Sequence, residues 1–210
     1  MSRAKAAADR VALDAYMTPD PLALAICAEI RRRGEDPMDV IEPSAGSGAF
    51  VRAARVTWDM AHVTAVELDP TKRTPLTVAG AQLVVVEEWV RWATGLANIQ
   101  GDEGFDRLVV GNPPFRQAQA HVEAALDLLR VGDRLAFLLR LNFLGSRDRV
   151  RFWRRPGLES VQTIAPRPSF TGGGTDGTEY ALFTWRKGYR GAPRILSPLV
   201  WTPERKRSAA

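Results

Sequence analysis

The sequence predicts an α/β fold in which a mostly parallel sheet is joined by crossover helices. Short β-type runs alternate with stretches of helical periodicity, no internal repeat occurs, and 45% hydrophobic content in 210 residues suffices for one substantial core. We therefore expect a single domain over residues 1–190. Residues 191–210 are expected to form an irregular, basic tail, because prolines recur there and the chain closes with Arg205-Lys206-Arg207.

The first half of the chain alternates helices with strands. Residues 20–33 place Leu22, Ile26 and Ile30 on one face of a helix, and the helix ends in arginines that suit the negative pole of its dipole. Val40–Ile41 begins a short strand that runs into a glycine-containing turn. The remaining expected elements of this half are a helix over residues 49–56 and strands over residues 63–68 and 82–86.

The second half continues the alternation. Residues 95–104 are polar and contain glycine, which predicts a loop before the apolar strand 107–110. The other expected elements are a helix over about 117–130, a buried strand over 135–141, and strands over 161–164 and 180–185.

Charge and cysteine content narrow the function classes. Lys and Arg outnumber Asp and Glu by 29 to 24, and the formal charge of +5 favours polyanionic partners without identifying one. The single Cys27 excludes an internal disulfide and a thiolate cluster, and His62 and His121 are isolated, so we expect no metal site. No apolar run approaches the roughly 20 residues that cross a bilayer. These features predict a soluble, cytoplasmic protein.

The turn Glu42-Pro43-Ser44-Ala45-Gly46-Ser47-Gly48 lies where a strand passes into a helix. Its glycines allow the backbone to approach a ligand closely, which makes it a candidate cofactor-binding turn. Val51 stands where a dinucleotide fingerprint needs a third glycine, which counts against a dinucleotide-binding turn. A phosphate-binding P-loop is excluded, because no Gly-Lys-Ser/Thr follows.

Carboxylates follow the next two strands. Glu67 closes the second strand, where a carboxylate can accept hydrogen bonds from both ribose hydroxyls. Either Glu87 or Glu88, after the third strand, could accept a hydrogen bond from an adenine amino group. Ligands of open α/β sheets bind outside the carboxyl ends of the strands, so these acids and the glycine turn are expected to share one crevice.

The most specific motif is Asn112-Pro113-Pro114-Phe115, directly after a strand. An Asn amide oxygen and a backbone carbonyl fixed by prolines can both accept hydrogen bonds from one amino group, and the Phe ring offers a face on which a planar base can stack. Two such acceptors can direct the lone pair of a substrate amino nitrogen at a sulfonium methyl group without a strong general base. Positioning of the reactants then supplies much of the rate of methyl transfer.

Glu42–Phe50, Glu67–Asp69 and Asn112–Phe115 together resemble the amino-methylating DNA methyltransferases. Tyr16-Met17-Thr18-Pro19 is similar to that family's additional cofactor motif, and this order of segments resembles many N6-adenine enzymes. The resemblance extends over about residues 14–186. It implies a Rossmann-like class I methyltransferase fold: a mostly parallel seven-stranded sheet with an antiparallel final hairpin and helices on both faces.

The resemblance also implies S-adenosyl-L-methionine as the cofactor and assigns roles to individual residues. The implied cofactor-binding residues are Tyr16, Thr18, Glu42, Ser44, Gly46, Gly48, Phe50, Glu67, Leu68, Glu88 and Asn112. The implied catalytic residues are Asn112, Pro113, Pro114 and Phe115, and the target base would be held by Asn112, Pro113 and Phe115. Phe170, next to the glycine-rich segment 172–176, resembles part of the family's late loop and would be a second stacking wall.

Residues 140–155 are the richest candidate for nucleic-acid contact. Six arginines, including Arg147 and Arg151, alternate there with Phe143, Phe152 and Trp153. Arginines can neutralise phosphates, and exposed aromatic rings can stack on bases or fill the gap left by a flipped nucleotide. The alternative is an amphipathic helix whose aromatic rings pack inward and whose arginines are solvated.

We therefore expect methylation of adenine N6 in DNA by direct in-line transfer to a flipped base. Other acceptors remain open, namely cytosine N4, RNA adenine and protein glutamine, and so does a non-catalytic cofactor-binding subunit. DNA is the expected partner, with RNA less favoured. Because the chain shows no evident target-recognition domain, we expect either weak sequence selectivity or selectivity supplied by a separate specificity subunit or a homodimer.

Overall fold

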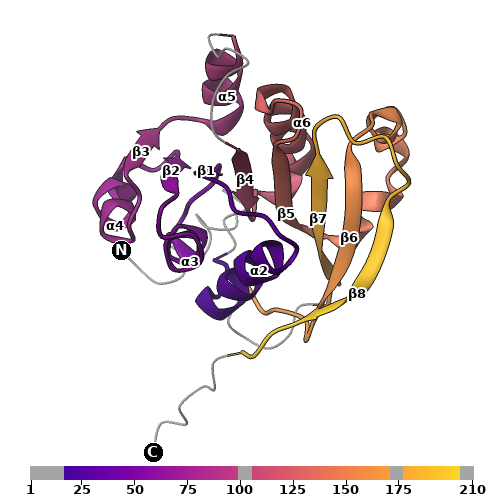
Figure 1. The fold of residues 1–210 in the computed structure, drawn as a ribbon, viewed down its shortest axis with the longest axis horizontal. Coiled ribbons are helices and arrows are strands. Elements are labelled where there is room, and N and C mark those ends of the chain that lie inside the picture. Colours follow the sequence, from indigo (N-terminus) through magenta and orange to yellow (C-terminus); the bar gives the residue numbers. More distant parts are fainter. Residues whose placement is uncertain (1–16, 99–105, 171–176, 204–210) are drawn as a thin grey trace, which may run out of the picture.

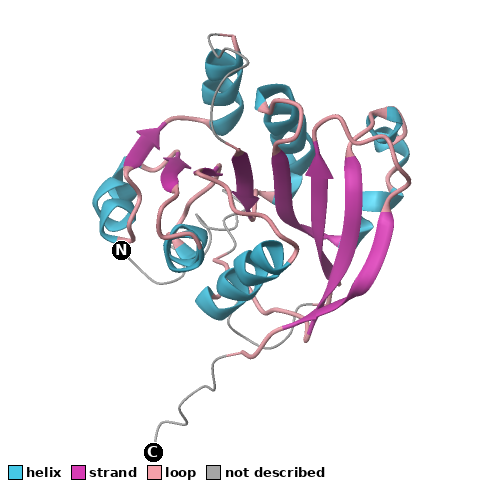
Figure 2. Cartoon of the chain, viewed as in Figure 1, coloured by secondary structure: helices cyan, strands magenta, loops and turns pink. Residues whose placement is uncertain are grey.

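One sheet with helices on both faces organises the chain (Figures 1 and 2). The computed structural model describes residues 17–98, 106–170 and 177–203. The strands are β1 (Asp39–Glu42), β2 (His62–Glu67), β3 (Leu83–Val86), β4 (Arg107–Gly111), β5 (Arg134–Arg140), β6 (Leu158–Ala165), β7 (Tyr180–Arg186) and β8 (Arg194–Val200). Their order is β3-β2-β1-β4-β5-β7-β6-β8. Among these described strands, only β7 runs antiparallel to its neighbours.

The helices divide between the two faces. The α-helices are α2 (Asp20–Arg32), α3 (Ala49–Thr57), α4 (Arg73–Val78), α5 (Trp89–Ala97) and α6 (Ala118–Leu128). The described residues also form the short 3-10 helices η1 (Pro70–Lys72), η2 (Phe115–Gln117), η3 (Leu141–Gly145), η4 (Arg147–Arg149) and η5 (Phe152–Arg154). Figure 1 shows α2 and α3 on one side of the sheet, and α5 and α6 on the other.

Successive strand residues serve two separate cores. In β1, Val40 belongs to the core beneath α2 and α3, whereas Ile41 belongs to the core beneath α5 and α6. Strands covered on both faces are apolar at successive positions, which explains runs such as Leu108–Val110. The α/β prediction, the mostly parallel sheet and an antiparallel hairpin, formed by β6 and β7, are confirmed, but the hairpin is not the last element because β8 follows it.

The expectation of an irregular tail is wrong for residues 194–200, which form β8, and the described sheet therefore has eight strands rather than seven. β8 pairs in parallel with β6 at the sheet edge, with a register shift near Pro198. An edge strand tolerates a proline and exposed side chains because one of its sides faces solvent. Most of its residues are exposed, so its sequence lacks the continuous apolar run that identifies the inner strands.

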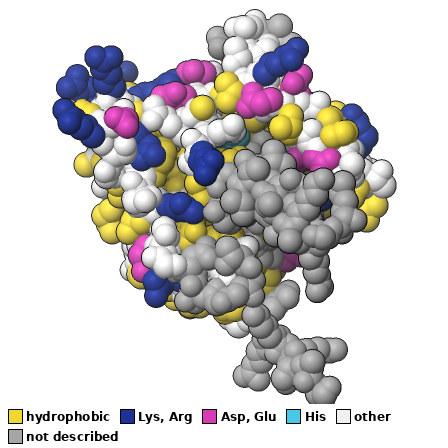
Figure 3. All heavy atoms as spheres, turned by 180° about the vertical axis from the view of Figure 1, so that it is seen from behind, with side chains coloured by type: hydrophobic (Ala, Val, Ile, Leu, Met, Phe, Trp, Pro, Cys, Tyr) yellow, Lys and Arg dark blue, Asp and Glu magenta, His cyan; other side chains and the backbone are white. Residues whose placement is uncertain are grey.

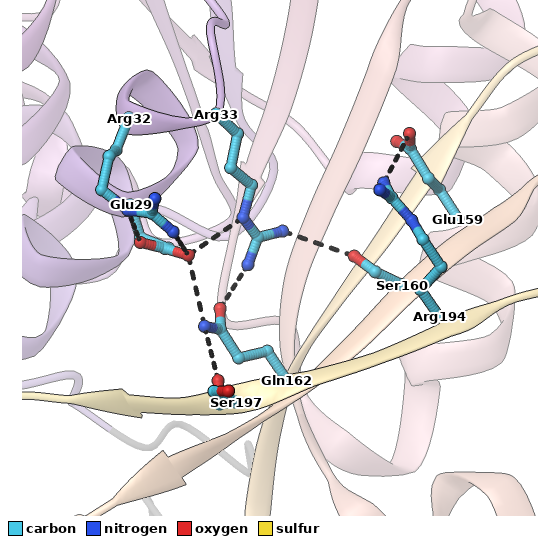
Figure 4. A network of polar contacts seen from close by, with 8 residues as sticks. All are labelled: Glu29, Arg32, Arg33, Glu159, Ser160, Gln162, Arg194 and Ser197. Atoms are coloured by element: carbon cyan, nitrogen blue, oxygen red, sulfur yellow. Dashed lines mark hydrogen bonds and ion pairs between the residues drawn. The ribbon is translucent and has the colours of Figure 1, made fainter.

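A polar network holds this edge of the sheet against α2 (Figure 4). The Glu29 carboxylate accepts hydrogen bonds from Arg32 at 2.7 Å and from Arg33 at 3.1 Å. Gln162 of β6 donates to Glu29 at 3.2 Å and to the Ser197 carbonyl of β8 at 2.8 Å. These hydrogen bonds lower the pKa of Glu29 to about 2, with the Arg32 contact as the largest cause and burial opposing it.

Two helices lie where no helix was expected. α4 is short and contains a proline, and α5 extends into the expected loop 95–104, of which residues 99–104 lie outside the described ranges. Glu88 caps α5 by accepting a hydrogen bond from the Arg91 backbone N–H at 2.9 Å. Within the described ranges, none of the helices is both long and apolar enough to cross a membrane.

Candidate cofactor and acceptor site

The candidate site lies where the strand order reverses. From β1 the chain continues to β2 on one side, whereas β4 lies on the other side of β1. Such a switch point opens a crevice at the carboxyl ends of the strands. A cavity of about 480 Å³ occupies this position, and its lining includes Thr18, Glu42, Ser44, Gly46 and Asn112. This volume lies in the range of small-molecule sites.

Glu42, the last residue of β1, is almost completely buried at the base of the cavity. Its Oε1 accepts a hydrogen bond from the Ser44 backbone N–H at 3.2 Å, while its Oε2 has no hydrogen-bond partner among the described residues. Burial raises the pKa of Glu42 well above its usual range, the Ser44 hydrogen bond opposes this, and the nearby charge of Glu67 adds to it. Such an acceptor suits a ligand cation or N–H donor.

Gly111 is required by the position of Glu42, a relationship that the sequence analysis missed. A Cβ atom on Gly111 would lie 2.3 Å from Glu42 Oε1, closer than any non-bonded contact allows. The lack of a side chain at the end of β4 thus makes room for the carboxylate at the end of β1. The available signal was the position of Gly111 immediately before Asn112.

Glu67 ties the glycine turn to β2. Its Oε2 accepts a hydrogen bond from the Gly46 N–H at 2.7 Å, and its Oε1 accepts one from the Asp69 N–H at 2.9 Å. Each carboxylate oxygen can accept a second hydrogen bond, so Glu67 can still bind a ligand hydroxyl while holding the turn. The expected convergence of the turn and Glu67 on one crevice is observed.

The two glycines of the turn play different structural parts. Gly46 has φ +51° and lines the cavity. Gly48 has φ +83° and precedes α3, and a Cβ there would lie 3.0 Å from Cβ of Ala79. Gly48 is not among the cavity-lining residues, so in the structure it allows α3 to pack near α4, whereas Phe50 reaches the cavity.

Asn112 connects the two ends of the expected site. Its Nδ2 donates a hydrogen bond to Thr18 Oγ1 at 3.1 Å, so the upstream segment and the Asn-Pro-Pro-Phe motif meet in space. Asn112 and Pro114 line the cavity, while Pro113 is buried beside it. Tyr16, also expected here, lies outside the described residues.

Phe115 lies next to the cavity rather than in its lining. Its ring contacts Tyr180 and Phe170 at centroid distances of 5.6 Å and 6.3 Å, and the guanidinium carbon of Arg140 lies 4.5 Å from the ring centroid. The structure thus brings together Phe115 and Phe170, the two residues expected to flank a base. The rest of the expected late loop, residues 171–176, lies outside the described ranges.

The third strand contributes two carboxylates to the cavity. Glu87 and Glu88 both line it, as does the exposed Leu68 at the end of β2. The backbone N–H of Glu88 donates to Glu87 Oε1 at 3.1 Å, whereas the Glu88 side chain caps α5. Both acids remain candidates for a contact with the cofactor adenine.

His121 of α6 lines the cavity, although its isolation in the sequence gave no sign of this. Its side chain is almost fully buried, its Nε2 lies 3.2 Å from Ser44 Oγ, and its Nδ1 lies 3.1 Å from the Gln117 carbonyl oxygen. Burial lowers the pKa of His121, while the Gln117 hydrogen bond and the charge of Glu88 oppose this change. Only the tertiary structure brings the ring to the glycine turn.

Residues 140–155 form three short 3-10 helices after β5 rather than one amphipathic helix. Phe143 and Phe152 are buried, and their ring centroids lie 5.7 Å apart. The interpretation of these rings as exposed wedges is therefore wrong, because they pack beneath the segment. Arg147 and Arg151 are exposed. Seen from behind the view of Figure 1, the molecule has several Lys and Arg side chains gathered at its upper left (Figure 3).

Comparison with solved structures identifies the fold. An O-methyltransferase from Bacillus cereus, solved in complex with SAH, superposes with a TM-score of 0.60 at 17% identity over 88% of each chain. The M protein of the type I restriction enzyme EcoKI superposes with a TM-score of 0.61 at 18% identity over 82% of this chain and 44% of that protein. The chain has the class I methyltransferase fold. In that fold, the cavity described above lies at the β1/β4 switch point.

One sequence relative extends the comparison. The type II methyltransferase M.CvrRI of Paramecium bursaria Chlorella virus XZ-6E is 29% identical over 80 residues, which are 38% of this chain. The matched region spans 19% of the viral protein's own length. No protein-family model matches the sequence.

Proposed function

We propose that this chain transfers a methyl group from S-adenosyl-L-methionine to the N6 amino group of adenine in DNA. The observation that carries the proposal is the meeting of Glu42, Ser44 and Asn112 in one cavity at the switch point of a class I methyltransferase fold. Cofactor-binding and acceptor-binding residues must share such a space if a methyl group is to pass between them.

The cofactor fits the donors and acceptors of the cavity. Glu42 Oε2, buried and without a hydrogen-bond partner among the described residues, would accept from the ammonium group of the methionine part. Glu67, at the end of β2, would accept from the ribose hydroxyls, and Glu87 or Glu88 from the adenine amino group. Bound S-adenosylmethionine supplies an electrophilic methyl group on a sulfonium.

Asn112 would hold the acceptor. Its amide oxygen and the Pro113 carbonyl would accept hydrogen bonds from the substrate amino group and aim the nitrogen lone pair at the methyl carbon. Transfer to this nitrogen would form a nitrogen–carbon bond while the carbon–sulfur bond of the sulfonium breaks, and the methylated nitrogen would lose a proton to solvent. Phe115, in contact with Phe170, would stack on the base.

Two observations favour DNA as the substrate. The sequence relative is a type II methyltransferase, and a type I restriction M protein shares the fold. The exposed Arg147 and Arg151 follow β5, which is parallel to β1 and β4. The carboxyl end of β5 therefore lies at the same end of the sheet as Glu42 and Asn112. We propose that these arginines bind phosphates, and that a specificity subunit or a second copy of the chain selects the sequence.

The test is methyl transfer from labelled cofactor to unmethylated DNA, RNA and protein, followed by nucleoside mass spectrometry. We expect N6-methyladenine in DNA, and we expect Asn112→Ala to lower the rate at least roughly 100-fold while cofactor binding is retained. Asn98→Ala, at an exposed asparagine that ends α5, is the matched control and should leave the rate unchanged.

Other outcomes of this experiment would change the proposal in different ways. N4-methylcytosine, methylated RNA or methylated glutamine would replace the acceptor in the proposal while leaving the cofactor assignment intact. Cofactor binding without transfer to any substrate would indicate a non-catalytic subunit. Failure to bind the cofactor at all would overturn the proposal.

A further inference from the structure

His121 makes two hydrogen-bond contacts that together fix its tautomer. Its Nδ1 lies 3.1 Å from the Gln117 carbonyl oxygen, and a carbonyl oxygen can only accept. The proton of the neutral ring is therefore on Nδ1, and Nε2 carries a lone pair. It follows that the Ser44 hydroxyl, 3.2 Å from Nε2, donates its proton to the ring.

This arrangement determines what Ser44 offers to a ligand. Because its only proton points at His121, the Ser44 oxygen presents lone pairs to the cavity that both residues line. If the ring gains a proton, Nε2–H becomes the donor and the Ser44 hydroxyl proton must turn elsewhere. The same oxygen would then change from an acceptor to a donor toward the cavity.

We propose that His121 is a positioning residue for the cofactor, which acts through Ser44 by holding the hydroxyl of the glycine turn as a hydrogen-bond acceptor. The inference rests on the proposed function, since it assumes that the cavity binds S-adenosylmethionine. It assigns a role in cofactor binding to α6, whereas the other polar contacts proposed for the cofactor come from the segment before α2 and from the strand ends.

The surroundings of the ring support a neutral imidazole at physiological pH. Burial is the main influence on the ring and lowers its pKa, so protonation is expected only as the pH falls below the ordinary range near 6.5. Glu88, at the start of α5, is the charged group that opposes this shift. The other ionisable residues that line the cavity are Glu42, Glu67, Asp69, Glu87 and Arg116.

Substitutions can distinguish the effect of a hydrogen-bond acceptor at position 121 from the effect of protonating the His121 ring. His121→Gln replaces the ring with a neutral amide whose oxygen can accept from Ser44 but cannot be protonated in this pH range. His121→Phe keeps a flat ring without any acceptor. Ser44→Ala removes the hydroxyl through which His121 is proposed to act, and the double variant His121→Phe with Ser44→Ala tests whether the two residues act together.

The binding experiment measures affinity for S-adenosylmethionine and for its demethylated product by calorimetry between pH 5.5 and pH 8. At pH 8, we expect His121→Gln to bind like the wild type, and His121→Phe and Ser44→Ala each to bind about fivefold more weakly, with no further loss in the double variant. As the pH falls to 5.5, the wild type should lose affinity, whereas His121→Gln should lose clearly less, because its amide cannot be protonated and the raised pKa of Glu42 is common to both proteins.

A second readout does not depend on the cofactor. The sequence contains two histidines, His62 and His121, so imidazole nitrogen NMR with His62→Gln as the assignment variant can observe the His121 ring alone. We expect a neutral ring protonated on Nδ1 at pH 7. A ring protonated on Nε2, or a His121→Gln affinity profile that parallels the wild type across the pH range, would overturn the inference while leaving the cofactor assignment standing. A wild type that binds neither compound would overturn both.

Discussion

Gly111 lies directly against the carboxylate of Glu42, so that a Cβ atom at position 111 would lie 2.3 Å from Glu42 Oε1. The two residues end neighbouring strands on either side of the switch point. The cavity can therefore hold a buried carboxylate at its base only if position 111 carries no side chain.

Gly111→Ala is expected to disable the cofactor site. The new methyl group must displace Glu42 or the backbone, which should lower the free energy of unfolding by about 1–3 kcal/mol and cofactor affinity at least roughly tenfold. Chemical unfolding and calorimetry measure the two effects. Gly95→Ala is the control, because a Cβ there meets nothing within 4 Å and a helical alanine should stabilise α5 by up to about 1 kcal/mol.

Glu42→Gln is expected to raise the free energy of unfolding of the cofactor-free protein at pH 8 but to weaken cofactor binding. The folded-state pKa of Glu42 lies well above its usual range, so the stability contributed by the protonated carboxyl is fully present below about pH 4.5 and is lost as the pH rises through that folded-state pKa. Without cofactor, the variant should therefore be more stable than the wild type at pH 8 and similar to it at pH 4.5.

The same variant should bind the cofactor roughly 10- to 100-fold more weakly at pH 8, because an amide cannot take on the negative charge that the carboxyl can carry when it pairs with the ligand cation. Unfolding curves at the two pH values, with and without cofactor, give both quantities. Affinity equal to that of the wild type would rule out Glu42 as the partner of the ligand cation.

Glu29→Gln is expected to weaken the attachment of β6 and β8 to α2. The pKa of Glu29 is lowered to about 2, so its contribution to stability is present above pH 4.5 and is lost as the pH falls toward 2. We expect the variant to lose about 1–3 kcal/mol at pH 7 and visibly less at pH 3. Asp36→Asn, at a carboxylate whose side chain is 74% exposed, should cost under about 0.5 kcal/mol. An equal loss at both pH values would contradict the assignment.

Removing Arg147 and Arg151 together should weaken DNA binding without changing cofactor binding. If each arginine binds one phosphate, the slope of log affinity against log salt should fall by about two. Fluorescence anisotropy over a salt series measures this slope. Arg190→Ala is the control. This exposed arginine follows β7, which is antiparallel to β5, so it lies at the opposite end of the strands from Arg147 and Arg151. A weaker affinity with an unchanged slope would show that the arginines act on the protein rather than on phosphates.

The local pattern of residues was enough to predict most of the fold. Strands such as β5 carry apolar residues on both faces, and helices such as α2 repeat them on one face, because these periods follow from backbone geometry alone. The same holds for the candidate cofactor turn and the Asn-Pro-Pro-Phe motif, whose residue types and order suffice to suggest their chemistry. β8 escaped prediction because most of its side chains are exposed at the sheet edge, so it needs no continuous apolar run.

Contacts between distant residues were decided only by the tertiary structure. The sequence alone indicated Glu42 and Asn112 as candidate binding residues, because each has a polar side chain at or directly after the end of a predicted strand. It could not indicate that Gly111 makes room for Glu42 or that His121 reaches Ser44 across 77 positions. The family resemblance placed Thr18 and Asn112 at one site, but not the hydrogen bond between them. Such contacts depend on which strands become neighbours and on how a helix packs over them, and neither leaves a periodic signal in the chain.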